Sequence, residues 1–404
     1  AASKTGGVYV WGNNNAYQIG DQTNENSAYP VAVGSSALNI DKRVIRIQTS
    51  EAADVTASTS AKLFSLFDGA FEQTSEITWR ILDENIAQLV NTTGTVTSGD
   101  LKSNVATIQG LKNGTTVIIA TDSITGKTVS ARITVCEGFT NPKIAIGNDF
   151  VIALKADGTI WGWGANDYGK TGTGTSSSVI VSPTLIDKYI NPTNNQVFDI
   201  AYSDTEGMLD IAVGADHALA IDQDGQLYAW GLNNYGQLGV NYYSYNNADK
   251  PVMIKDLSDA QIVAVAAGGD HSLALTDTGY VYAFGKNTRG QLGNGGAHGN
   301  QSPTPAIIKG VGGNGTLSGV VDIAAGAEHS MVMLGNGSLW TFGDNTNKQL
   351  GVDSLSDGNK YSANIMQVKL PEDTVVSAIK AGVYNSAFIT NKGDAYIWGN
   401  NEFH

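Results

Sequence analysis

The sequence predicts an all-β protein, a β-propeller that is interrupted by a second unit built of short β segments. Glycine makes up 48 of the 404 residues without a three-residue period, which is typical of many tight turns between short strands. One pattern of glycines and aromatic residues returns about every 55 residues along most of the chain. Between Pro30 and Asn141 this pattern disappears. A chain of this length can bury two hydrophobic cores, which fits two structural units.

The repeat is anchored on the glycine that ends an IAxG or AAG segment, at Gly147, Gly214, Gly268, Gly326 and Gly382. A turn glycine follows eleven residues later, at Gly158, Gly225, Gly279, Gly337 and Gly393. An aromatic residue before a glycine follows sixteen residues after the anchor, at Trp163, Trp230, Phe284, Phe342 and Trp398. Nine residues further comes another glycine, usually after Gln-Leu, at Gly172, Gly239, Gly293 and Gly351. These offsets predict a unit whose length varies only in its outer loops.

Each unit reads as four antiparallel strands. The segment HALAIDQDGQLYAWG has apolar residues on both sides of Asp224-Gly225, which is the pattern of a hairpin whose turn needs a positive φ. Such a unit cannot bury both faces alone, so copies must stack, and radial stacking produces a propeller. We expect the aromatic residue of the repeat to wedge between neighbouring blades.

Residues 265–293, VAAGGDHSLALTDTGYVYAFGKNTRGQLG, resemble the regulator-of-chromosome-condensation repeat family, and the resemblance covers about 300 residues. Its members are typically seven-bladed propellers, so the resemblance implies six to seven blades here. Trp11-Gly12 and Gln18-Ile19-Gly20 extend the series to the N-terminus. Four units are complete, the first lacks its inner two strands and the last lacks its outer part. The sequence leaves three alternatives open: this chain is part of a larger ring, its two halves complete a blade together, or another copy or partner chain completes it.

The interruption adds about 97 residues, because Trp11 and Trp163 are 152 positions apart where one repeat of about 55 is expected. The segments RVIRIQT, EITWRI, IAQLV, NVATIQG, TTVIIAT and TVSARITV, separated by turn residues, predict a β-sandwich. ITWRILDENIAQLV and the later GLKNGTTVIIATDSITGKTVSARITV are similar to the bacterial immunoglobulin-like group 2 family, which implies that Trp79 packs in the core. The predicted domains are propeller 1–40, immunoglobulin-like insertion 41–137 and propeller 138–404. The resemblance implies an extracellular or bacterial cell-surface location.

Charge and cysteine content narrow the classes of partner. The net charge of −14 and the absence of a basic run argue against nucleic acid. Cys136 is the single cysteine, and we expect its side chain to be buried as a small hydrophobic residue. The sequence contains no Cys/His cluster and therefore predicts no metal site. The sequence contains no run of eighteen apolar residues, so it predicts no membrane-spanning segment. The acidic turn from Asp222 to Gly225 lacks the remaining calcium ligands and is expected to be a hairpin turn.

Histidine recurs at one place in the repeat, three residues after the anchor glycine. His217, His271 and His329 share this position with Phe150 and Asn385. A catalytic or metal-binding histidine would not be repeated around a ring and replaced by phenylalanine, so we expect these residues to satisfy backbone groups. No nucleophile, phosphate-loop or dinucleotide motif occurs, so the sequence predicts no catalytic residue, no cofactor and no enzyme.

The candidate binding residues lie in outer loops. The segment GVNYYSYNNADK places Asn241, Tyr242, Tyr243 and Tyr245 together, a composition that binding surfaces favour, although such tyrosines can also cover blade edges. Tyr168 and Tyr235 belong to the WGxNxxGQLG loops, whose repeated asparagines are expected mainly to hold turns.

Three functions follow as hypotheses. The first is a bacterial surface or secreted module whose propeller face binds a protein or a glycan, with the insertion projecting or spacing it. The second is an enzyme inhibitor, because some members of the repeat family block β-lactamases with aromatic loops. The third is a structural subunit of a surface assembly, whose incomplete end units close against each other or against a neighbour.

Overall fold

The structure of the 404-residue chain is a computed structural model. It describes residues 77–91, 95–98, 101–122, 128–137, 139–203, 206–240, 247–257, 260–295, 301–352, 355, 360–372 and 374–402. Of residues 1–76 it describes the backbone of five strands. Every regular element in these ranges is a β-strand, apart from three short 3-10 helices, η1 (Asp167–Gly169), η2 (Lys255–Leu257) and η3 (Val311–Gly313).

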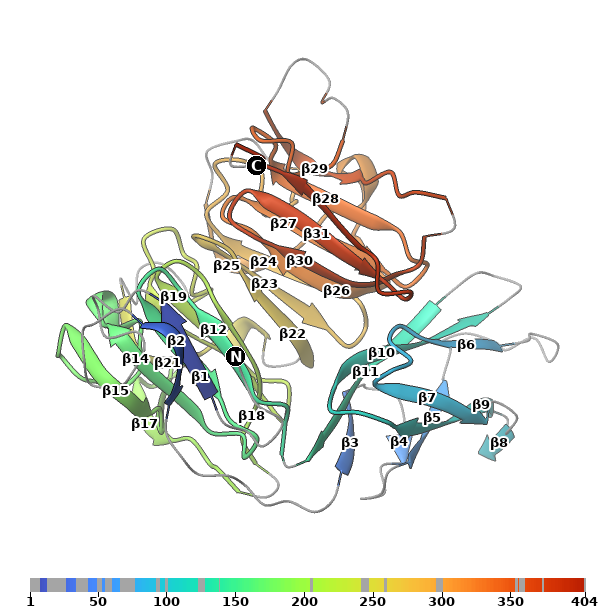
Figure 1. The fold of residues 1–404 in the computed structure, drawn as a ribbon, viewed down its shortest axis with the longest axis horizontal. Helices are drawn as coiled ribbons and strands as arrows, with labels where there is room; N and C mark the ends of the chain where they lie inside the picture. Colours follow the sequence, from blue (N-terminus) through green and yellow to red (C-terminus); the bar gives the residue numbers. More distant parts are fainter. Residues whose placement is uncertain are drawn as a thin grey trace.

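The repeats form five sheets, which we name blades A to E (Figure 1). Blade A contains β12 (Lys143–Ile146), β13 (Phe150–Leu154), β14 (Ile160–Ala165) and β15 (Val179–Leu185). Blade B contains β18 (Met208–Val213), β19 (His217–Asp222), β20 (Leu227–Leu232) and β21 (Asn247–Met253). Blade C contains β22 (Ile262–Ala267), β23 (His271–Thr276), β24 (Val281–Gly285) and β25 (Ser302–Ile307). Blade D contains β26 (Val320–Ala325), β27 (His329–Leu334), β28 (Leu339–Asp344) and β29 (Tyr361–Gln367), and blade E contains β30 (Val376–Ala381), β31 (Asn385–Thr390) and β32 (Ala395–Gly399).

Within each blade the strands pair in chain order and antiparallel, as the repeat predicts. The partial first unit is seen as the pair β1 (Val8–Gly12) and β2 (Ser27–Val33), and the last as the three strands of blade E. The 67-residue spacing from Gly147 to Gly214 has a structural cause, because a hairpin of β16 (Lys188–Asn191) and β17 (Gln196–Asp199) extends blade B to six strands. The variation in repeat length is thus outside the core strands, as expected.

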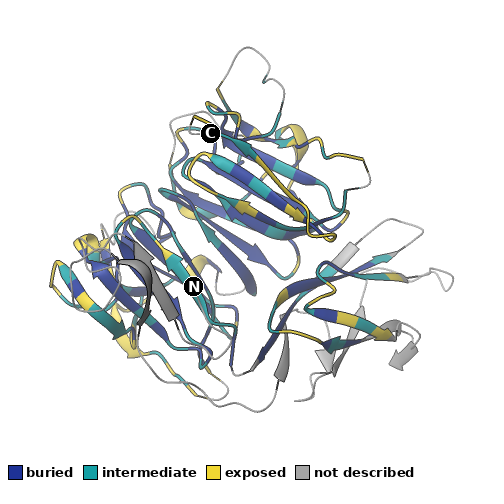
Figure 2. Cartoon of the chain, viewed as in Figure 1, coloured by how far each residue is buried: buried dark blue, intermediate teal, exposed yellow. Residues whose placement is uncertain are grey.

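The aromatic residue of the repeat wedges between blades, as predicted. Trp163, Trp230, Phe284 and Phe342 are fully buried. Each of the last three sits against the glycine that ends the Gln-Leu-Gly loop, or its equivalent, in the preceding blade: a Cβ on Gly172 would lie 2.6 Å from Trp230 Nε1, and one on Gly293 would lie 2.9 Å from Phe342 Cε2. The glycine nine residues after the aromatic residue is therefore required because the next blade's ring occupies the space of its side chain. The second and third strands of blades B and C are accordingly almost completely buried (Figure 2).

The insertion folds into two antiparallel sheets. One contains β3 (Arg43–Gln48), β11 (Thr128–Glu137), β10 (Gly114–Asp122) and β6 (Ile77–Ile81). The other contains β4 (Ala53–Asp54), β5 (Ser60–Ser65), β9 (Leu101–Gly110), β7 (Ala87–Asn91) and β8 (Thr95–Ser98). The two sheets share one core, which includes Ile81, Ile108, Ile118 and Ile133, with Trp79 packed against it. The six segments predicted as strands are strands, and Cys136 is buried as expected.

The insertion packs on the propeller instead of projecting from it. Leu82, Val117 and Ile119 belong to the same apolar cluster as residues of blades D and E, such as Val321 and Val376. The Arg80 side chain also donates a hydrogen bond of 2.6 Å to the carbonyl of Gly335. The sequence expectation of a projecting spacer is therefore wrong for the described part of the insertion, since the face of β10 opposite the insertion's own core buries apolar side chains against two blades. Figure 1 shows β10 and β11 at the side of the insertion that is turned to the propeller.

Candidate functional site

One end of every blade carries two loops side by side, and we call this surface the loop face. The first loop follows the anchor glycine, and the second follows the aromatic-glycine pair. Backbone hydrogen bonds join them, for example from Leu232 N–H to Asp216 O at 2.8 Å and from Lys286 N–H to Asp270 O at 2.8 Å. This pairing places equivalent residues of successive blades at neighbouring points of one surface.

The repeated asparagines of the second loop are structural, as predicted. In each of blades A to D the asparagine side chain is buried and its Oδ1 accepts the N–H five residues later. The Asn233 bond to the Leu238 N–H is 3.0 Å and the Asn287 bond to the Leu292 N–H is 3.1 Å. These asparagines close the turns and do not line a binding surface.

The histidines lock each blade to the next one. His217 Nε2 lies 2.9 Å from Ser272 Oγ in blade C, and Ser272 Oγ donates to the carbonyl of Gln237 at 2.8 Å. Since the serine proton is used on that carbonyl, the serine oxygen accepts the proton of His217 Nε2, which defines the neutral Nε2–H tautomer. The same arrangement joins His271 to Ser330 at 2.9 Å and His329 to Ser386 at 2.8 Å.

The predicted structural role of the repeated histidines is thus confirmed, but their hydrogen-bond partners differ from those expected. Sequence reasoning expected them to bond backbone groups, but each bonds a serine hydroxyl of the next blade. Burial lowers the pKa of His217 and His271 to about 3 and that of His329 to about 4, so all three are neutral.

A sequence signal for this bond was available and was missed. Blade A has Phe150 in place of the histidine, and blade B has Ala218 in place of the serine that would receive it. Both residues are fully buried in the same apolar cluster. A polar pair in three blade contacts is therefore replaced by an apolar pair in the fourth, which avoids an unpaired buried hydroxyl.

Acidic residues follow the first loop around the loop face. Asp149, Asp216, Asp270 and Glu328 stand two residues after successive anchor glycines. Two lysines of the second loop bridge them in pairs. Lys170 Nζ lies 2.5 Å from Asp149 Oδ1 and 2.8 Å from Asp216 Oδ1, and Lys286 Nζ lies 2.7 Å from Glu328 Oε1 and 3.5 Å from Asp270 Oδ2.

Each of these lysines joins the acid of its own blade to that of the next. Burial alone would lower the pKa of Lys170, but the hydrogen bonds to Asp149 and Asp216 outweigh it and raise the pKa. Burial likewise opposes protonation of Lys286, and the bonds to Glu328 and Asp270 raise its pKa above the ordinary value. The charges at these two blade contacts are thus fixed in place rather than free in solvent.

The residues predicted for binding are placed as follows. Tyr168 and Tyr235 occupy equivalent points of the second loop in blades A and B, so both lie on the loop face. Tyr168 is 51% exposed and has a φ of 65°, whereas Tyr235 is half-buried with Lys286 Nζ 5.2 Å from its ring centroid. Asn241, Tyr242, Tyr243 and Tyr245 lie outside the described residues.

The structure adds two exposed residues that sequence reasoning did not select. Val383 and Tyr384 of blade E are 59% and 46% exposed. Tyr384 takes the position of the acidic residue in the other blades, and its carbonyl accepts the N–H of Asn400 at 3.0 Å, which puts it on the loop face. A comparison of the position two residues after each anchor glycine would have identified Tyr384, because the other four blades have an acidic residue there.

The described ranges show neither a metal site nor a membrane-spanning helix. No three His, Cys, Asp or Glu residues there are placed to hold a metal ion, and no helix there is long and apolar enough to cross a membrane. The turn from Asp222 to Gly225 is a hairpin turn as predicted, because Asp222 Oδ1 accepts the N–H groups of Asp224 and Gln226 and Gly225 has a φ of 74°.

Known proteins share the repeat region. The chain is 30% identical to the human E3 ubiquitin-protein ligase HERC2 over 279 residues, which is 68% of this chain and 5% of HERC2. It is 26% identical to the ultraviolet-B receptor UVR8 of Arabidopsis thaliana over 261 residues, or 64% of this chain and 52% of UVR8. The chain thus spans at most about half of either relative.

Solved propellers match at the level of the fold. Yeast RCC1 (Prp20) bound to Kap60 matches with a TM-score of 0.53 and 25% identity over 64% of this chain and 56% of that chain. The Saccharomyces cerevisiae Prp20p structure, whose description names binding to Gsp1p and histones, matches with a TM-score of 0.53 and 26% identity over 64% of this chain and 57% of that chain. RCC1 repeats match residues 5–51, 143–170 and 157–221, and the RCC1-like domain matches residues 190–404. The chain therefore belongs to the RCC1-like repeat family.

Proposed function

We propose that this chain is a non-catalytic binding module whose loop face recognises a partner protein. The observation that carries the proposal is the presence of exposed Tyr168 and Tyr384 on a face where Lys170 and Lys286 are held in ion pairs between blades. Tyrosine provides a large contact area at a small cost in side-chain entropy, and a rigid scaffold reduces the ordering cost of binding. The related Prp20p is described by its binding to proteins, which supports a protein partner over a glycan.

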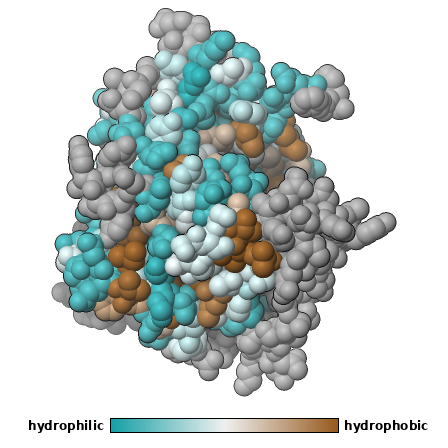
Figure 3. Space-filling view, turned by 90° about the vertical axis from the view of Figure 1, so that its left-hand side faces the viewer, coloured by the Kyte–Doolittle hydropathy of each residue, from teal (hydrophilic) through white to brown (hydrophobic). Residues whose placement is uncertain are grey.

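Other surfaces support a partner less well. The side of the molecule shown in Figure 3 carries apolar residues in patches separated by hydrophilic ones. Scattered exposed apolar residues, such as Val181 at 43% and Val197 at 50% on blades A and B, are normal for a protein surface. The loop face differs because exposed tyrosines stand on its loops, Tyr168 on the second loop of blade A and Tyr384 on the first loop of blade E.

The location that we propose is the bacterial cell surface or the extracellular space. The support is the similarity of residues 41–137 to bacterial immunoglobulin-like domains, together with their two-sheet fold and shared core. The insertion would then stiffen the propeller, since it packs on blades D and E.

A binding screen with matched variants tests the loop-face proposal. The immobilised chain is presented with a bacterial surface-protein fraction and, separately, with a glycan array. We expect a protein that binds saturably and loses at least about tenfold in affinity with Tyr168→Ala plus Tyr384→Ala, since exposed aromatic anchors carry much of the binding energy. Tyr280→Ala is the control, because Tyr280 is exposed in the turn between β23 and β24 at the opposite end of a blade. Equal binding by the double variant, or saturable binding to glycans alone, would contradict the proposal.

A structural role in an assembly is the second candidate, and one observation favours it. Ile389 and Ile397 on blade E are 45% and 72% exposed. Residues seven positions after the anchor glycine, where Ile389 stands, are at most 2% exposed in blades A to D. Blade E thus presents the kind of surface that the other blades bury against a neighbour.

Mass measurement in solution tests this second candidate. We expect a concentration-dependent dimer that Ile397→Lys converts to a monomer, because a charge at the centre of an apolar contact is costly to bury. A strict monomer at all concentrations would exclude self-association. The predicted enzyme inhibition depends on residues 241–246, outside the described residues.

A further inference from the structure

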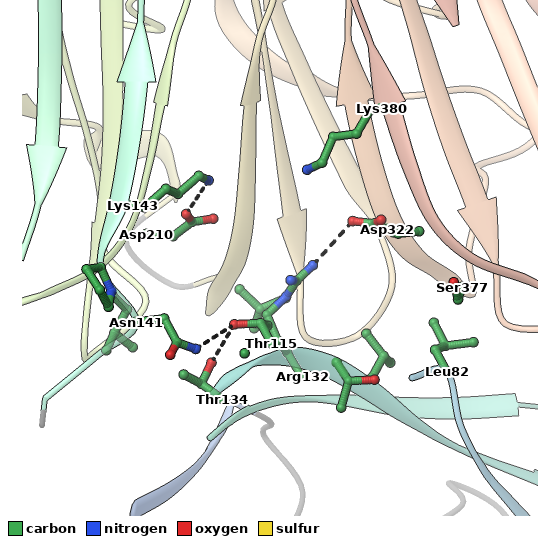
Figure 4. Close-up of a pocket in the computed structure, with 17 residues that line it drawn as sticks. Leu82, Thr115, Arg132, Thr134, Asn141, Lys143, Asp210, Asp322, Ser377 and Lys380 are labelled. Carbon is green, nitrogen blue, oxygen red and sulfur yellow. Dashed lines mark hydrogen bonds and ion pairs between the residues drawn. The ribbon is translucent and has the colours of Figure 1, made fainter. Parts of the chain in front are cut away.

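A cavity of about 300 Å³ lies where the insertion meets the propeller (Figure 4). On one side it is lined by β10 and β11 of the insertion. On the other it is lined by the first strand of every blade, β12, β18, β22, β26 and β30. The cavity therefore lies on the inner side of the blades, along their first strands, and none of its lining residues belongs to the two loops of the loop face.

The repeat itself sets the positions of the charged groups in this cavity. Lys143, Asp210 and Asp322 each stand four residues before an anchor glycine. In blades B to E the strand has a register shift at this position, which turns the side chain toward the inner side. Blades C and E carry alanine there, and Ala378 of blade E lines the cavity.

The cations of the cavity are only partly matched by anions. Lys143 Nζ is paired with Asp210 Oδ1 at 2.6 Å. Arg132 of the insertion lies 3.6 Å from Asp322 Oδ1, too far for a hydrogen bond, and that oxygen already accepts the N–H of Ile323 at 3.0 Å. Arg132 Nε and Nη2 are buried and make no hydrogen bond with a described residue.

Lys380 adds a third positive charge. It lines the cavity, and Figure 4 shows its side chain directed toward the space between the blades and the insertion. No ion pair joins it to a described residue. Three cations against two carboxylates leave the cavity with a charge of +1 in a chain whose net charge is −14.

We propose that this cavity binds a small organic carboxylate between Arg132 and Lys380. A carboxylate would supply the acceptor that the guanidinium lacks and would neutralise Lys380. The hydroxyl groups of Thr115 and Thr134 and the amide of Asn141 line the same wall, so they would bind further oxygens of a hydroxylated or dicarboxylic acid. The volume is at the lower end of ligand sites, which suits a molecule of a few carbon atoms.

The site would couple its ligand to the docking of the insertion. Arg132 comes from the insertion, whereas Lys380 and Asp322 come from blades E and D. A carboxylate that contacts both parts stabilises their association, because it binds only where the two lie together.

Calorimetric titration and thermal unfolding of the full chain test the proposal. The probes are sodium acetate, succinate and citrate at constant ionic strength, with chloride as the reference. We expect saturable binding and a rise in Tm with at least one of the three acids. Arg132→Gln and Lys380→Gln should each weaken binding about tenfold, the effect of losing one charge-assisted hydrogen bond. Asp322→Asn should strengthen it, because it removes the carboxylate that competes for Arg132.

Further variants keep the outcome unambiguous. Lys380 is exposed, so Lys380→Gln keeps the fold even where Arg132→Gln loosens the insertion. Lys392→Gln, an exposed lysine in the turn between β31 and β32, is the matched control and should bind as wild type. No saturable response to any acid, binding that survives Lys380→Gln, or binding lost in Asp322→Asn would each overturn the proposal. Because none of these residues lies on the loop face, failure here leaves the loop-face function untouched.

Discussion

Acid is expected to unfold this propeller through its buried histidines. His217, His271 and His329 are neutral in the fold because burial lowers their pKa values to about 3, 3 and 4. In the unfolded chain each has a pKa of about 6.5, so below that pH the unfolded state binds more protons than the folded state. Stability is therefore complete above about pH 6.5 and falls as the pH drops toward 4, by up to roughly 1.4 kcal/mol per pH unit for each histidine. The three together contribute about 4 kcal/mol per pH unit.

Denaturant unfolding at a series of pH values between 7 and 4.5 measures this slope. Asp222 and Asp270 act in the opposite sense, because burial raises their pKa values, but mainly at lower pH near the ordinary aspartate value. The double variant His271→Phe plus Ser330→Ala is the control, since it copies the pair Phe150 and Ala218 of the blade A and B contact. It should remain folded and lose about a third of the slope. A stability that stays flat between pH 6.5 and 4.5 would show that the histidines are protonated in the fold.

The single variants report on the same bond. Ser330→Ala leaves His271 Nε2–H without its acceptor in a fully buried site, which should cost about 1–3 kcal/mol. His271→Phe alone leaves the Ser330 hydroxyl beside an apolar ring. A double variant less destabilised than the sum of the singles would show that the two residues act as a pair.

The largest effect of one substitution is expected for Trp230→Ala. Trp230 is fully buried between blades A and B, and its Nε1 donates a hydrogen bond of 3.1 Å to the carbonyl of Lys170. Its removal leaves a cavity against Gly172 and an unpaired carbonyl, so the free energy of unfolding should fall by about 3–5 kcal/mol. Trp230→Phe should cost only about 1–2 kcal/mol, because Phe284 and Phe342 fill the same position in blades C and D.

Thermal or urea unfolding of Trp340→Ala provides the comparison. Trp340 is half-buried, and its Nε1 bonds Ser338 in the turn of its own blade at 3.0 Å, so it crosses no blade boundary. Trp340→Ala should therefore lower the free energy of unfolding clearly less than Trp230→Ala does. Equal effects of the two substitutions would mean that the repeat aromatic residue has no special place between blades.

Predictions from sequence succeeded where the information was local and periodic. The offsets from Gly147 to Gly382 located the strands and turns, the aromatic wedges and the turn-closing asparagines, because each depends on contacts that every repeat makes in the same way. They also located the partial first and last units, which the pair β1 and β2 and the three strands of blade E display.

The candidate site was predicted less completely. Tyr168 and Tyr235 were identified because they stand inside the repeat motif, whereas Tyr384 was missed because it departs from its acidic counterparts. Lys170 was also missed as a charged partner. It occupies the position of Gln237, Gln291 and Gln349 in the other blades, and its carboxylate partners are 21 and 46 residues away in sequence, as the positions of Asp149 and Asp216 show.

By itself, the sequence determined the repeat, its four-stranded unit, the all-β insertion and the structural nature of the histidines, since these follow from local spacing and from residue types that recur. Only the tertiary structure decided which serine each histidine bonds, and that the insertion packs on blades D and E with Arg132 beside Asp322. Arg132 and Asp322 are 190 residues apart, as their numbers show, and no periodic pattern relates them. Contacts between units of different kinds depend on how whole surfaces fit, and a linear pattern carries no record of that fit.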